Sequence, residues 1–248
     1  MRLYLTGAEG ELPHLPPGLG YALVDPCFGA SPDAALRGRE GVLLLGGGLE
    51  PERTSAAARE CRRRGIRAVA AGFGRSSALD TLRFCDAMLR QGITPILPEE
   101  NWVSGCGGER LISTAVSGGT LEERLRETLQ QSPDLALDLE RLRHRFPLPC
   151  PEGRGTPIPP EELEARLSGG APSAFSRELL CRAMPLDEGE ASCFILYDDR
   201  ETLCEKVRLA AALGVRRGFL LYPEWSPEDA AAALEAAEGQ GKSPAISG

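Results

Sequence analysis

Short apolar runs that look like buried strands recur along this chain at a nearly constant interval. The predicted strands span residues 42–46, 67–73, 94–97, 111–116, 135–140, 193–198 and 217–222. Most steps measure about 25 residues, the length of one strand–helix unit. A chain of 248 residues built in this way has the size of one (β/α)8 barrel. The sequence therefore predicts an α/β fold, a (β/α)8 barrel with parallel strands inside and helices outside.

Two parts of the chain depart from this period. Residues 3–5 and 21–25 are both short apolar runs, and either would serve as the first barrel strand. Sequence rich in Pro and Gly interrupts the period within residues 146–190, so we expect a distorted or incomplete barrel there. We expect residues 1–248 to form a single barrel domain, with residues 239–248 as a flexible tail rich in Gly and Ser.

The bulk composition excludes several classes of partner. A net charge of −8 opposes binding to nucleic acid, because phosphate neutralisation requires a basic face. No apolar run approaches the roughly 20 residues of a membrane span, and the Met1–Leu5 segment is too short for a signal peptide. We therefore expect a cytoplasmic protein that binds neither nucleic acid nor membrane. The oligomeric state stays open.

The cysteines and histidines do not have the spacing of a metal site. The chain has 8 Cys and 2 His, and no two cysteines form a C-x-x-C pair. Cysteines scattered over presumed strands and helices are typical of small buried apolar residues. In a reducing compartment they remain free thiols. We therefore expect no metal and no cofactor.

Two acidic residues end the strand predicted over residues 135–140. Asp138 and Glu140 are two residues apart, so in a strand they point to the same side. Neighbouring carboxylates repel each other, and burial raises the pKa of one of them further, which suits general acid catalysis. The alternative is that these carboxylates form ion pairs with Arg141 or Arg143.

Two further predicted strands are followed by acidic residues beside a tryptophan. Glu99, Glu100 and Trp102 follow one of them, and Glu224 and Trp225 follow the last. Sugars bind through such pairs, since the ring stacks on an apolar sugar face and the carboxylate accepts hydroxyl hydrogen bonds. The alternative is a tryptophan that packs beneath a loop.

The strand predicted over residues 193–198 ends in Tyr197 and Asp198. Both side chains would face the mouth of a barrel. Asp199 is better placed to cap the helix that begins at Arg200.

Several segments have the pattern of a known family. A Ser-Gly-Gly sequence (residues 117–119) ends one predicted strand, and Leu-Asp-Leu-Glu (residues 137–140) ends the next. Residues 197–206 and 214–225 have the pattern of a last βα unit and a closing strand. Together these segments resemble the chitinase-like family 18 glycoside hydrolases, whose barrels carry an S-x-G-G strand followed by a D-x-x-D-x-D-x-E strand. The resemblance covers about a third of the chain and implies a barrel that cleaves or binds a glycan.

The resemblance also implies roles for individual residues. Glu140 would be the general acid, and Asp138 would orient it or orient an N-acetyl group of the substrate that acts as the nucleophile. Tyr197 would donate a hydrogen bond to a developing oxyanion.

The chain departs from the family motif in its acidic positions. Pro133 and Ala136 stand where the motif requires acids. The family places the motif on its fourth strand, whereas by sequence order the strand over residues 135–140 is the fifth or sixth. A second candidate for the motif, residues 69–74, has Gly72 and Gly74 at the acidic positions. If that strand is the equivalent one, the catalytic pair is missing.

Two rival interpretations follow. One is a non-catalytic barrel that binds a carbohydrate or a protein partner. The other is a doubly wound α/β domain that binds a phosphorylated ligand. The glycine sequence over residues 46–48 lacks the third glycine of the dinucleotide motif, because Pro51 stands there, which disfavours the second.

Overall fold

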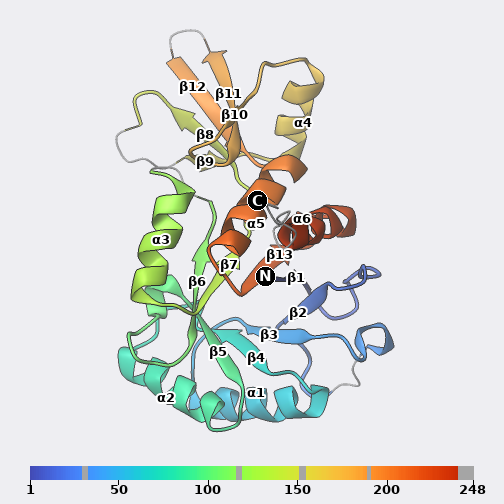
Figure 1. Cartoon of the computed structure of the whole chain (residues 1–248), viewed down its shortest axis with the longest axis vertical. Helices are drawn as coiled ribbons and strands as arrows, with labels where there is room; N and C mark the ends of the chain where they lie inside the picture. The colour runs from blue at the N-terminus through green and yellow to red at the C-terminus, as the bar shows by residue number, and fades with distance from the viewer. Residues whose placement is uncertain (30–32, 116–118, 151–154, 189–190, 240–248) are drawn as a thin grey trace, which may run out of the picture.

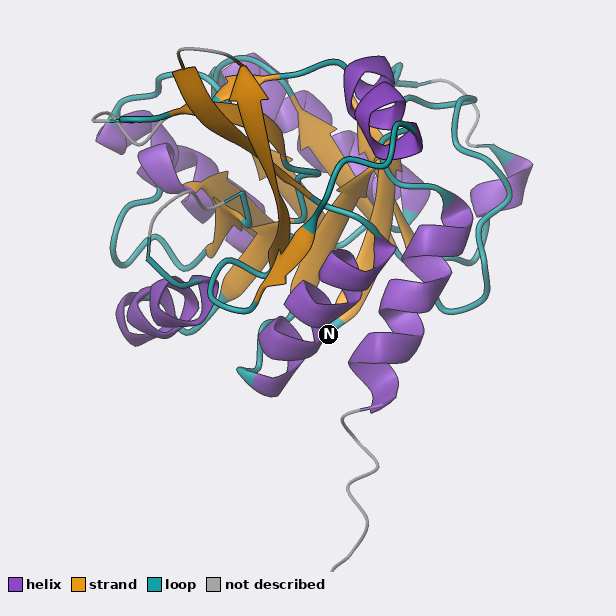
Figure 2. Ribbon diagram, turned by 90° about the horizontal axis from the view of Figure 1, so that it is seen from above, coloured by secondary structure: helices purple, strands orange, loops and turns teal. Residues whose placement is uncertain are grey.

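Eight parallel strands close into a barrel with helices around it, as the sequence predicts (Figures 1 and 2). The protein is represented by a computed structural model that describes residues 1–29, 33–115, 119–150, 155–188 and 191–239. Around the barrel the strands lie in the order β1-β13-β7-β6-β5-β4-β3-β2. Their bounds are β1 Arg2–Gly7, β2 Gly20–Val24, β3 Gly41–Leu45, β4 Ala68–Ala71, β5 Thr94–Pro98, β6 Glu109–Ser113, β7 Leu135–Asp138 and β13 Arg217–Leu221. The closed barrel excludes the doubly wound alternative.

Both N-terminal apolar runs belong to the barrel. Residues 3–5 lie in β1 and residues 21–24 in β2, and the two strands pair in parallel with Leu5 opposite Tyr21. β1 also pairs with β13, where Thr6 lies opposite Leu221. The first and last strands of the barrel are therefore joined.

Only some of the barrel strands are followed in the sequence by a described α-helix. Along the chain, helix α1 (Pro51–Arg64) follows β3, α2 (Ala78–Leu89) follows β4 and α3 (Leu121–Gln131) follows β6. Helix α5 (Arg200–Ala212) precedes β13 in the sequence, and α6 (Pro227–Gly239) follows it. The loop after β1 carries no described helix, while β2 and β5 are followed by the short 3-10 helices η1 (Ala34–Leu36) and η2 (Glu99–Asn101). Residues 240–248, most of the predicted tail, lie outside the described residues. None of the described helices has the length and apolar character needed to cross a membrane.

The region that interrupts the sequence period forms a second sheet. Between β7 and α5 the chain makes five antiparallel strands in the order β10-β11-β12-β8-β9. Figure 1 shows them grouped beyond one end of the barrel. Their bounds are β8 Arg143–Pro147, β9 Thr156–Pro157, β10 Ala174–Ser176, β11 Cys181–Glu188 and β12 Ala191–Tyr197, and helix α4 (Pro160–Ser168) lies among them.

The prediction that residues 193–198 form a parallel barrel strand is wrong. They belong largely to β12, which pairs in antiparallel fashion with β8 and β11. A short apolar run does not reveal which sheet it joins. The eight barrel positions are already filled, because both N-terminal runs are strands.

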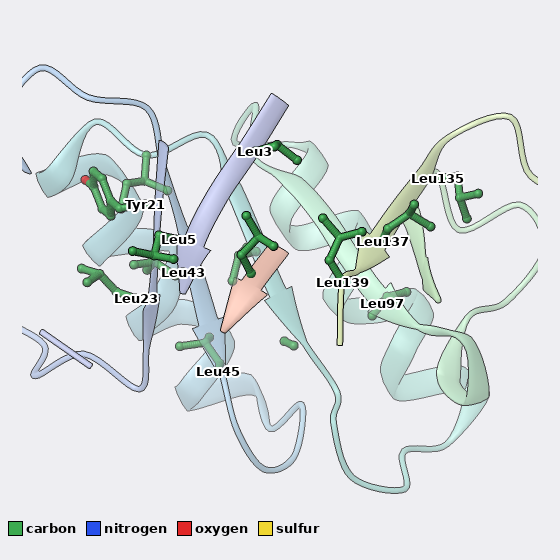
Figure 3. Packing of buried hydrophobic residues seen from close by; sticks show 14 of the residues in the cluster. Leu3, Leu5, Tyr21, Leu23, Leu43, Leu45, Leu97, Leu135, Leu137 and Leu139 are labelled. Atoms are coloured by element: carbon green, nitrogen blue, oxygen red, sulfur yellow. The ribbon is translucent and has the colours of Figure 1, made fainter. Parts of the chain in front are cut away.

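The barrel interior combines large and small side chains. The rings of Tyr4 and Phe219 stack with their centroids 5.4 Å apart. Ala22, Ala70 and Ala136 line the same interior cluster and leave space for these rings. The neighbouring residues of the strands face outward, and Figure 3 shows part of the resulting leucine-rich cluster between strands and helices.

Candidate functional site

Side-chain alternation sets the ring of residues at the mouth of the barrel. Tyr4, Ala136 and Phe219 belong to the interior cluster, so the residues two positions further along each strand also face inward. These residues, at the carboxyl ends of the strands, are Thr6, Asp138 and Leu221, with Ser113 two residues after the interior Leu111. The carboxyl ends of the strands are where barrels of this kind place their functional groups.

A cavity of about 370 Å³ lies where the mouth meets the inserted sheet. The end of β7 and the residues after it, the β8–β9 hairpin and the end of β13 contribute its walls. The lining residues are Asp138, Glu140, Arg141, Arg143, His144, Pro157, Ile158, Leu221 and Glu224. Three of the residues predicted from the sequence, Asp138, Glu140 and Glu224, are therefore brought together. The basic and apolar wall was not predicted, since it depends on a sheet that the sequence pattern did not reveal.

The two carboxyls of the predicted pair have different surroundings. Asp138 faces the barrel interior, and burial, followed by the charge of Glu140, raises its pKa from 3.8 to about 6. Glu140 is exposed and accepts a hydrogen bond from Ser113 Oγ at 2.9 Å. Within the described part of the chain, no hydrogen bond joins the two carboxyls, and neither has an ion-pair partner. The raised pKa thus belongs to Asp138, whereas the resemblance implies the general-acid role for Glu140.

The other charged groups of the cavity are engaged with one another. Arg143 forms a two-point ion pair with Glu224, with Nη2 2.9 Å from Oε1, and the pair lowers the pKa of Glu224. Arg141 Nη1 donates to the Glu224 carbonyl oxygen at 2.7 Å, and its guanidinium lies 4.9 Å from the centre of the Trp225 ring. The predicted alternative, an ion pair between Arg141 or Arg143 and the Asp138 strand end, is not what the structure shows.

Three other predicted site residues are buried and do not line the cavity. Tyr197 is 5% exposed, and its hydroxyl bonds to Ser173 Oγ at 2.7 Å within the inserted sheet. Asp198 is 1% exposed and forms an ion pair with Lys206 Nζ at 2.7 Å. Trp225 is 1% exposed and donates from Nε1 to a backbone carbonyl at 2.7 Å. The predicted contacts of these side chains with a substrate are therefore corrected to structural roles.

The acidic residues after β5 lie away from the cavity. Glu99 forms ion pairs with Arg110 and with Arg124, the latter at 2.9 Å. Trp102 lies under the guanidinium of Arg110, which is 5.4 Å from its ring centre, and donates to a backbone carbonyl at 3.4 Å. Glu100 is exposed. The prediction is corrected for Glu99 and Trp102, because their side chains contact β6 and α3, and the sugar contact of Glu100 stays a prediction.

The fourth strand of the barrel carries no acid at its end. β4 is fourth in chain order, and Gly72 and Gly74 follow it, Gly72 with a φ of 81°. Asn101 Nδ2 donates to the carbonyl oxygens of both glycines, and Asn101 Oδ1 accepts from the Ser76 amide at 3.1 Å. This side-chain clamp, which the sequence analysis missed, fixes the loop. Residues 117 and 118 of the Ser-Gly-Gly sequence lie outside the described residues.

The fold is similar to that of solved glycoside hydrolases. It matches the spore cortex-lytic enzyme SleL of Bacillus megaterium with a TM-score of 0.60 and 10% identity, over 95% of this chain and 73% of that one. A chitinase from Chromobacterium violaceum matches with a TM-score of 0.60 and 10% identity over 81% and 80% of the two chains. A family 18 chitinase from Cycas revoluta, crystallised with (GlcNAc)3, matches with a TM-score of 0.54 and 12% identity. The match covers 82% of this chain and 81% of the chitinase.

These likenesses show the fold and confirm the resemblance to family 18 glycoside hydrolases at that level. No protein-family model matches the sequence, and the search of curated proteins finds no match.

Proposed function

We propose that this protein binds a glycan in the cavity at the barrel mouth and does not cleave it with the acid pair of the chitinase-like barrels. The observation that carries the proposal is the end of the fourth strand. If residues 69–74 are the equivalent of the family motif, Gly72 and Gly74 stand at its two acidic positions, and Asn101 donates hydrogen bonds to both of their carbonyl oxygens. Neither glycine supplies a proton or a negative charge to a glycosidic bond.

The composition of the cavity supports a saccharide ligand. Carboxylates such as those of Asp138 and Glu140 accept hydrogen bonds from sugar hydroxyls. Ile158 and Leu221 offer apolar surface to the C–H face of a sugar ring, and Leu221 is 48% exposed at the mouth. Small-ligand sites combine such apolar walls with a few polar groups. The Cycas revoluta chitinase holds (GlcNAc)3, so oligomers of N-acetylhexosamines are the first class to test.

The test is calorimetric titration of the protein with (GlcNAc)4 and with its de-N-acetylated counterpart. We expect saturable binding of at least one of them, weakened on the order of fivefold by Leu221→Ala because apolar contact area is lost. Leu167→Ala is the matched control, since Leu167 is 40% exposed on α4 and does not line the cavity. Absence of binding to both oligomers, or equal effects of the two leucine variants, overturns the proposal.

Hydrolysis with Asp138 as the acid is the second candidate. Its pKa of about 6 is near the value that suits a general acid at neutral pH. Glu140 lines the same cavity and would then be the second carboxyl of the pair. This assignment reverses the two roles that the sequence resemblance implies, and the products of incubation with a glycan distinguish it from binding alone.

A further inference from the structure

We infer that the cavity selects a sugar unit with a free amino group over its N-acetylated counterpart. The inference rests on the proposed glycan binding and names the chemical class of ligand. Its basis is a pair of carboxyls, Asp138 and Glu140, that share one cavity wall and lack a cationic partner among the described residues.

The cavity is lined by three carboxyl side chains and two arginines, which leaves one formal negative charge in excess. Glu224 is neutralised by the two-point ion pair with Arg143. Arg141 directs Nη1 at the Glu224 carbonyl oxygen, 2.7 Å away, and Nε at the Asp198 carbonyl oxygen, 3.4 Å away, with its guanidinium over Trp225. These donors point to backbone carbonyls and not to Asp138 or Glu140, and Arg141 keeps its positive charge at the cavity wall.

Asp138 occupies an unfavourable position for a carboxylate. It faces the barrel interior with intermediate exposure, lines the cavity, and receives no hydrogen bond from a described group. Partial burial without donors raises the free-energy cost of its negative charge, and the neighbouring Glu140 adds repulsion. A ligand that donates hydrogen bonds and brings positive charge relieves both effects.

An ammonium group fits this requirement better than an acetamido group. An ammonium has three N–H donors and no acceptor, so it can bond to both carboxyls at once. An acetamido group has one N–H and a carbonyl oxygen, which places a second acceptor beside two acceptors. The apolar wall of Pro157, Ile158 and Leu221 then faces the ring of the same sugar.

The experiment compares the tetramer of glucosamine with (GlcNAc)4 by calorimetry at pH 7 and low salt. We expect the free amine to bind at least about tenfold more tightly, and 0.5 M salt to reduce this preference because it screens the partly exposed Glu140. Glu140→Gln should lower the preference several-fold, and Asp138→Asn should remove it. Glu127→Gln, an exposed carboxylate on α3, should leave it unchanged.

The outcomes separate this inference from the proposed function. If (GlcNAc)4 binds as tightly as the amine or more tightly, the inference fails while glycan binding stands. If the amine preference survives in both Asp138→Asn and Glu140→Gln, the ammonium lies elsewhere and the inference also fails. If neither oligomer binds, both proposals fail.

Discussion

Ser113 Oγ donates a hydrogen bond to Glu140 Oε2 over 2.9 Å and links the ends of the sixth and seventh barrel strands at the cavity. The same hydroxyl oxygen accepts from the Ala115 amide at 3.0 Å. We expect Ser113→Ala to lower the free energy of unfolding by about 1 kcal/mol and to weaken glycan binding a few-fold, because Glu140 is no longer held. Ser113→Thr keeps the hydroxyl and should retain both. Denaturant unfolding and calorimetry check this, and a fully unaffected Ser113→Ala contradicts it.

The ion pair of Asp198 and Lys206 fixes the return from the inserted sheet to the barrel. The two side chains are 0% and 2% exposed, and Asp198 Oδ2 also accepts from the Leu142 amide at 2.9 Å. We expect Lys206→Met to destabilise the protein by about 3–5 kcal/mol, since it leaves a buried carboxylate uncompensated. The double variant Asp198→Asn/Lys206→Met should recover part of this loss. An exposed pair gives the control: Arg90→Ala, which breaks the contact with Asp86, should cost less than about 1 kcal/mol.

Asp138 should make the folded state less stable as the pH rises. Its pKa is raised from 3.8 to about 6 in the fold, so this side chain binds more protons in the folded than in the unfolded chain between these values, and its contribution to stability falls as pH increases through this window. We expect Asp138→Asn to raise the unfolding free energy at pH 7.5 on the order of 2 kcal/mol, and this gain to shrink by roughly half or more at pH 4.5. The exposed Asp86→Asn should show no such gain. Denaturant unfolding at the two pH values measures it, and a pH-independent gain contradicts the account.

Binding of an amino sugar should release protons. The charged and titratable groups of the cavity besides Asp138 are Glu140, Arg141, Arg143, Glu224 and His144. With its pKa near 6, Asp138 is about half protonated at pH 6, and a neighbouring ammonium lowers that pKa. We therefore expect release of up to about half a proton at pH 6 and weaker binding as the pH falls below 6. Calorimetry in two buffers of different ionisation enthalpy measures this. Proton uptake at pH 6, or release unchanged in Asp138→Asn, contradicts it.

The barrel could be predicted because it depends on local patterns. The apolar runs over residues 42–46 and 94–97 are each set by nearby residues, and they are seen as β3 and β5. The inserted sheet could not be predicted in this way. The sequence of β12 resembles that of a barrel strand, and what distinguishes β12 is its antiparallel pairing with β8 and β11.

The site was predicted in part for the same reason. Alternation is a property of one strand, so it can place Asp138 at the inner face of the end of β7. It cannot give the hydrogen bond predicted between Asp138 and Glu140, which is not formed among the described residues. Trp225 is buried because the loop after β13 packs against Leu139, and Asp198 is buried because it pairs with Lys206 of α5. These contacts cannot be read from the sequence patterns next to Trp225 and Asp198. The pairing of Arg143 with Glu224 joins residues 81 positions apart.

The most direct test of binding without cleavage is the mass spectrum of a glycan after long incubation with the protein. The tetramers of glucosamine and N-acetylglucosamine are each incubated at saturating concentration between pH 5 and pH 7, with the bound fraction measured in the same samples. We expect bound but intact tetramers, because the fourth strand is followed by Gly72 and Gly74 in place of carboxylates. Accumulation of shorter oligomers by the wild type, lost in Asp138→Asn and retained in Glu127→Gln, would contradict it and identify Asp138 as a catalytic acid.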